Sequence, residues 1–181
     1  MACGYHSRLH ACLLTVFMDK DTEILAAIIL SAARSKGLKI ATAESCTGGL
    51  IAGTLTAIPG SSDVVDRGFV TYSNEAKQQM LGVGSISLEK FGAVSSVTAK
   101  EMAYGALVNS MADITISVTG VAGPGGGTAE KPVGTVWFGL ATQGTAPVAE
   151  CVQFGDMGRK SVRAGSVLHA LNMLNTGIGA L

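Results

Sequence analysis

Short strand-like segments alternate along this chain with longer segments of helical periodicity, and this alternation narrows the fold more than any other feature. Strands are predicted at 39–43, 67–72, 114–119, 135–142 and 148–154. Helices are predicted at 22–35, 50–57, 97–111 and 158–174, with one more between its cap Ser73 and its stop Gly82. This order is typical of a three-layer α/β/α sandwich with a mixed, mostly parallel sheet and one antiparallel strand.

The core of such a fold has to be built from aliphatic side chains, because 48% of the residues are hydrophobic but only 5% are aromatic. We expect Met102, Ala106, Val108 and Met111 to face the core, and Asp156 to cap the last helix. The strands 135–142 and 148–154 are joined by three residues only, which predicts an antiparallel hairpin.

The 181 residues suit one domain, which we place at 19–181. Residues 1–18 carry His6, Arg8 and His10 before a short apolar run, and we expect them to form a peripheral N-terminal tail. A signal peptide is the alternative, but no small-residue cleavage pattern follows the apolar run. Met18 is a second candidate for the start of translation.

Charge and cysteine content exclude several classes of protein. The formal net charge is zero without a basic stripe, so no nucleic-acid or membrane partner is predicted. Cys3, Cys12, Cys46 and Cys151 are scattered without a CxxC pair, which disfavours a metal site and a disulfide framework and favours a cytoplasmic protein. No apolar run reaches the roughly 18 residues that a membrane-spanning helix needs. A small ligand that meets a local basic site remains compatible with this balance.

Three predicted strands end in polar or glycine-rich segments, at 44–49, 72–77 and 119–127. Ligands of such sheets bind beyond the carboxyl ends of the parallel strands, so the three segments should converge on one crevice. In the first segment, Ser45 occupies a strand-to-helix turn that would expose its hydroxyl.

The same turn offers backbone donors. The N–H groups of Thr47, Gly48 and Gly49 at the predicted helix start would bind a phosphate or stabilise an oxyanion. The plainer alternative is that Ser45 or Thr47 only caps the helix.

A nucleophilic serine needs a base, and the histidines are poorly placed to supply one. His6 and His10 lie in the tail, and His169 lies deep in the last helix. Lys77 and Tyr72, both beyond the second strand, remain as candidates. A solvated helix lysine and a tyrosine packed in the core are the ordinary alternatives for these two residues.

Three further features complete the candidate site. Cys46 is a rival nucleophile, although a buried small cysteine is the preferred interpretation. The glycine-rich segment 120–134 is long for a connection and is closed by Pro132, which suggests a fixed lid. Arg159 opens the last helix one turn before Arg163 and would bind a phosphate or carboxylate, with ordinary solvated charge as the alternative.

Four segments in this order resemble the C-terminal domain family of the competence/damage-inducible protein CinA, over about residues 22–174. These segments are Ala43-Glu44-Ser45-Cys46-Thr47-Gly48-Gly49, Gly68-Phe69-Val70-Thr71-Tyr72-Ser73-Asn74-Glu75-Ala76-Lys77, Gly120-Val121-Ala122-Gly123-Pro124 and Lys131-Pro132-Val133-Gly134-Thr135-Val136.

The resemblance implies a sandwich of the anticodon-binding-domain type and an amidase activity. The implied reaction is hydrolysis of the carboxamide of nicotinamide mononucleotide to nicotinate mononucleotide and ammonia, without a metal or other cofactor. The family's catalytic serine, tyrosine and lysine fall on Ser45, Tyr72 and Lys77, and its late arginine falls on Arg159. The substrate-binding residues that we expect are Thr47, Gly48, Gly49, Thr119, Gly120, Gly123 and Arg159.

Two other functions stay open, because a fold does not fix a function. One is a non-catalytic nucleotide-binding or regulatory domain of the same fold, and the other is a cysteine-dependent enzyme that uses Cys46. A homo-oligomer is one possibility for the assembly.

Overall fold

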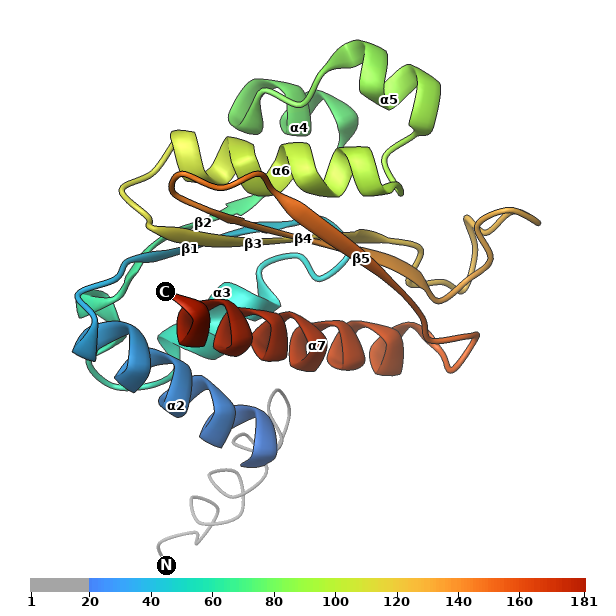
Figure 1. Ribbon diagram of the computed structural model, residues 1–181. Coiled ribbons are helices and arrows are strands. Elements are labelled where there is room, and N and C mark those ends of the chain that lie inside the picture. The colour runs from blue at the N-terminus through green and yellow to red at the C-terminus, as the bar shows by residue number, and fades with distance from the viewer. Residues whose placement is uncertain (1–19) are drawn as a thin grey trace, which may run out of the picture.

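The computed structural model describes residues 20–181 and shows a five-stranded sheet between two layers of helices (Figure 1). The strands are β1 (Ile40–Glu44), β2 (Val65–Val70), β3 (Ile114–Gly120), β4 (Thr135–Thr142) and β5 (Val148–Gln153). The helices are α2 (Lys20–Ser35), α3 (Leu50–Thr56), α4 (Asn74–Leu81), α5 (Ser85–Phe91), α6 (Ser96–Val108) and α7 (Arg159–Ala180), with a 3-10 turn η1 (Ser61–Asp63). The predicted tail at 1–18 lies outside the described residues.

The sheet has the order β2-β1-β3-β4-β5. β1 pairs in parallel with β2 and β3, whereas β4 runs antiparallel to both of its neighbours, β3 and β5. The predicted mixed, mostly parallel sheet and the predicted hairpin are both confirmed. As a result, the carboxyl ends of β1, β2 and β3 lie side by side at one edge, where the sequence places the site.

Helices α2, α3 and α7 cover one face of the sheet, and α4, α5 and α6 cover the other (Figure 1). The side chains of Val162, Val167, Leu171 and Leu174 on α7 are buried, as their helical spacing predicts. On the opposite face α6 packs very closely on the end of α4. A Cβ atom at Gly105 would lie 2.0 Å from the carbonyl oxygen of Leu81, so only glycine fits there. This contact fixes α4 against the sheet.

Several local predictions were wrong. α5 was not predicted, and α6 ends at Val108, earlier than expected. Val108 and Met111 are 58% and 76% exposed, contrary to the prediction, whereas Met102 and Ala106 are buried as predicted. Asp156 does not cap α7, because the chain enters that helix through Gly158 at φ 82°, a value that favours glycine.

In residues 20–181, no helix is long and apolar enough to cross a membrane.

Candidate active site at the carboxyl edge of the sheet

The backbone at the end of β1 continues into the site without a break. The N–H of Ser45 donates to the carbonyl oxygen of Val118 (2.9 Å), and the N–H of Thr71 donates to that of Glu44 (2.8 Å). Ser45 therefore lies between the ends of β2 and β3, in the middle of the parallel part of the sheet. It is the position where ligands of open α/β sheets bind.

Lys77 reaches Ser45 from α4. Its Nζ lies 3.0 Å from Oγ of Ser45 and donates to the carbonyl oxygen of Thr71 at 2.8 Å. The side chain is only 1% exposed, so the solvated lysine considered from the sequence is wrong. Burial lowers the pKa of Lys77, because the charged ammonium loses water that two hydrogen bonds do not fully replace. The structure thus places the amine of Lys77 directly against the hydroxyl of Ser45.

Cys46 points into a different environment from Ser45. Its side chain is 5% exposed and packs in the main core, as preferred from the sequence. Burial raises the pKa of the thiol from 9.0 to about 11. Because the thiolate is the nucleophilic form, this environment disfavours the cysteine-dependent alternative.

The start of α3 is filled by a side chain of the protein itself. The carboxylate of Glu44 accepts hydrogen bonds from the N–H groups of Gly49, Ile51 and Ala52, at 2.9, 3.1 and 2.8 Å. The N–H of Gly48 donates to the carbonyl oxygen of Ser45. This arrangement differs from the open helix start that the sequence predicts.

Two N–H groups of the turn stay available. Within residues 20–181, the N–H groups of Cys46 and Thr47 have no hydrogen-bond acceptor in another residue. The hydroxyl of Thr47 is buried and also lacks a partner there. The carbonyl oxygen of Thr47 accepts a hydrogen bond from Nη2 of Arg163 at 2.8 Å, which ties the turn to α7. This role of Arg163 was not predicted from the sequence.

The side chains of Arg159 and Tyr72 meet beyond the end of β2. Nη2 of Arg159 donates to the Tyr72 hydroxyl at 2.7 Å, and Nη1 donates to the carbonyl oxygen of Gly123 at 3.1 Å. Tyr72 is 61% exposed, so packing in the core is excluded. One arginine thus connects α7, the end of β2 and the 121–134 loop, three parts that are far apart in sequence.

The other predicted binding residues lie along β3 and the loop that follows it. Thr119 is buried, and its hydroxyl donates to the carbonyl oxygen of Ala93 at 2.8 Å. Gly120 ends β3, and a Cβ there would lie 2.7 Å from the carbonyl oxygen of Thr135. The loop is fastened to α5 by Lys131, whose Nζ donates to the carbonyl oxygen of Phe91 at 2.6 Å.

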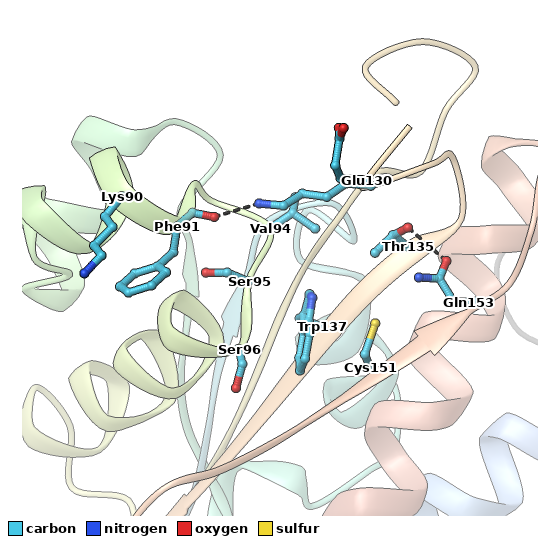
Figure 2. A pocket seen from close by; sticks show the side chains of 11 residues that line it. Lys90, Phe91, Val94, Ser95, Ser96, Glu130, Thr135, Trp137, Cys151 and Gln153 are labelled. Carbon is cyan, nitrogen blue, oxygen red and sulfur yellow. Dashed lines mark hydrogen bonds between the residues drawn. The ribbon is translucent and has the colours of Figure 1, made fainter. Parts of the chain in front are cut away.

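A separate hollow of about 440 Å³ lies on the α6 side of β4 and β5 (Figure 2). Its walls include Phe91, Trp137 and Cys151. Ser45 and Lys77 do not line this hollow, so the candidate catalytic pair lies outside it. No group of three or more His, Cys, Asp or Glu side chains in residues 20–181 could hold a metal ion.

A buried lysine therefore lies against a serine at the carboxyl edge of an α/β/α sheet, which is where ligands of such sheets bind. The chain belongs to the CinA C-terminal domain family, whose profile matches residues 22–178. This confirms the resemblance inferred from the four sequence segments.

Two curated relatives match the chain over nearly their whole length. It is 49% identical over 154 residues to the nicotinamide-nucleotide amidohydrolase PncC of Enterobacter agglomerans, covering 84% of this chain and 93% of that protein. It is 47% identical over 158 residues to PncC of Escherichia coli, covering 86% and 94%.

Other relatives are longer. The chain spans about two fifths of the length of the putative competence-damage inducible proteins that it matches. It covers 37% of the one from Caldicellulosiruptor bescii, with 49% identity over 85% of this chain. It covers 40% of the one from Caldicellulosiruptor saccharolyticus. Among solved structures, the competence/damage inducible protein CihA from Agrobacterium tumefaciens matches with a TM-score of 0.88 and 50% identity, covering 91% of this chain and 99% of that one.

Proposed function

We propose that this chain hydrolyses the carboxamide of nicotinamide mononucleotide to nicotinate mononucleotide and ammonia, with Ser45 as the nucleophile and Lys77 as the base. The observation that carries the proposal is the 3.0 Å contact between Nζ of the buried Lys77 and Oγ of the half-buried Ser45. The names of the two PncC relatives support the choice of substrate.

In the first step the neutral amine of Lys77 takes the hydroxyl proton of Ser45 as Oγ attacks the carboxamide carbon. The lowered pKa of Lys77 favours the neutral amine, and the pyridinium charge of the substrate would favour it further. The resulting ammonium then donates its proton to the leaving nitrogen. Ammonia departs, and an ester between Oγ and the nicotinoyl group remains.

The second step releases the acid. Lys77 is neutral again and takes a proton from a water molecule, whose oxygen attacks the ester carbon. The bond from that carbon to Oγ then breaks, the acid leaves, and the ammonium of Lys77 returns its proton to Ser45. The oxyanion formed in each step needs donors, and the N–H groups of Cys46 and Thr47, which have no acceptor in another residue within residues 20–181, support this role. The N–H groups of Gly48 and Gly49 are already bonded within the protein, so we assign these glycines to the shape of the turn.

The phosphate of the substrate would bind Arg159 instead of the start of α3. A phosphate near Arg159 would compete with the Tyr72 hydroxyl and the Gly123 carbonyl for the guanidinium. Tyr72 would then be free to orient the carboxamide. Thr119 and Gly120 would form the wall of the site on the β3 side. A homo-oligomeric assembly stays a prediction.

Release of ammonia from nicotinamide mononucleotide by the purified protein tests this proposal. Nicotinate mononucleotide should appear in equal amount, and added chelator should leave the rate unchanged. Absence of turnover with a folded protein that still binds the nucleotide would support the regulatory-domain alternative.

A further inference from the structure

Glu44 is the residue directly before the proposed nucleophile, and its side chain is fully buried on the α3 side of the turn. Oε2 accepts from the N–H groups of Gly49 and Ile51, and Oε1 accepts from the N–H of Ala52 and the hydroxyl of Thr42. One carboxylate therefore ties the end of β1 to the first turn of α3. The chain between these two anchors is only the turn 45–48.

This turn is held by Glu44 at both of its ends, and also by the hydrogen bond from the Ser45 N–H to Val118 and by Arg163 on the carbonyl oxygen of Thr47. Gly48 and Gly49 have φ values of 62° and 93°, where the backbone has no side chain to restrict it. Lys77 is held independently, by the carbonyl oxygen of Thr71 and by the rigid packing of α4. A shift of the Glu44 carboxylate would thus move Oγ of Ser45 while leaving Nζ of Lys77 in place.

We propose that Glu44 is a positioning residue, which fixes Ser45 at reacting distance from Lys77 by bonding the start of α3 to the end of β1. The same bonds keep the helix start filled, so that anionic substrates are directed to Arg159. For turnover the inference rests on the proposed function, but the reactivity of Ser45 reports on it separately.

The variant that tests this is Glu44→Gln, which keeps the shape of the side chain. Whichever way the amide is oriented, its NH2 group replaces an oxygen that faces at least one backbone N–H, so a donor meets a donor. The carboxamide must then shift, and the turn with it. A displacement of a reacting atom by about 1 Å costs on the order of 100-fold in rate.

Two readouts are needed, kcat and KM for ammonia release and the labelling rate of Ser45 by a fluorophosphonate probe. In labelling, an Oγ–P bond forms, the P–F bond breaks, fluoride leaves and the serine proton passes to Lys77. We expect Glu44→Gln to lower kcat and the labelling rate about 10- to 100-fold. KM should change by less than about threefold, because the lost interaction does not contact substrate.

Glu101→Gln is the matched control. Glu101 also accepts a backbone N–H, from Gly84 at 3.0 Å, together with the hydroxyl of Ser87 beside the start of α5. Its replacement should lower thermal stability without slowing the labelling of Ser45. Equal labelling by Glu44→Gln and the wild type, or equal slowing by Glu101→Gln, overturns the inference.

Thr42→Val covers the case in which Glu44→Gln does not fold. It removes the hydroxyl that donates to Oε1 at 3.2 Å and leaves the other three bonds. Labelling of Ser45 should then fall several-fold, and an unchanged rate counts against the inference. A wild type that is labelled at Ser45 but releases no ammonia refutes the proposed function alone, whereas a wild type inert in both assays refutes both.

Discussion

The choice between Ser45 and Cys46 as the nucleophile is open to a direct test, because burial suppresses ionisation of the Cys46 thiol by a measurable factor. With its pKa raised from 9.0 to about 11, about one Cys46 thiol in 3,000 is ionised at pH 7.5, against about one in thirty without the shift. Iodoacetamide should therefore alkylate Cys46 roughly 100-fold more slowly than an unshifted thiol, before any steric protection is counted.

Alanine variants of Ser45 and Cys46 should differ clearly in turnover. Ser45→Ala should lower turnover by about 10³-fold or more, because the residual rate no longer involves a covalent intermediate. Cys46→Ala should keep most of the activity, since the thiol contributes packing in the core. Both variants should show the circular dichroism spectrum of the wild type.

The assay combines ammonia release with peptide mass spectrometry of samples treated with iodoacetamide at pH 7.5. Cys151, which is exposed, serves as the internal reference for alkylation. Rapid alkylation of Cys46 with parallel loss of activity, absent in Cys46→Ala, would refute the reasoning and assign the reaction to the cysteine.

Three further predictions follow from the same contacts. Turnover should rise with pH, with an apparent pKa below the ordinary lysine value of 10.5. Lys77→Arg should be nearly as inactive as Lys77→Met, because arginine keeps its proton. If Lys77→Arg retains most of the rate, Lys77 is not the base. Arg159→Ala should weaken binding of nicotinamide mononucleotide about 10- to 100-fold and that of nicotinamide riboside far less, as measured by calorimetry; equal losses would show that Arg159 does not bind the phosphate. Between pH 9 and 11 the free energy of unfolding should fall by about 2 kcal/mol more in the wild type than in Cys46→Ala, because the unfolded thiol ionises there while the buried one stays mostly protonated. Identical denaturation curves would contradict the shifted thiol.

Much of the architecture is predictable from the sequence because it depends on local periodicity. The helix cap Ser73 was placed correctly, and the strand ends near Ser45 and Tyr72 were placed to within two residues, because β-branched strands and capping residues can be recognised over a few positions. α5 was missed because its seven residues are too short to show a helical period. Val108 and Met111 were misplaced because the end of α6 depends on packing and not on hydrophobicity alone.

The sequence indicates which residues belong to the candidate site, but not which hydrogen bonds they make. Motif order selected Ser45, Tyr72 and Lys77, and the lack of a usable histidine directed attention to the lysine. Nothing in the sequence indicates that Glu44 fills the start of α3, because a carboxylate before a glycine-rich turn is equally compatible with exposure to solvent. The contact of Arg163 with the carbonyl oxygen of Thr47 spans 116 positions and is likewise invisible to local reasoning.

The sequence by itself determined which chemical groups this protein has and on which segments they stand. Only the tertiary structure decided their protonation and their partners. Lys77 is an ordinary lysine until α4 packs on α6 and the sheet and removes its water, which lowers its pKa, while the neighbouring core raises that of Cys46. Desolvation depends on everything that surrounds a group, and most of those surroundings are distant in sequence.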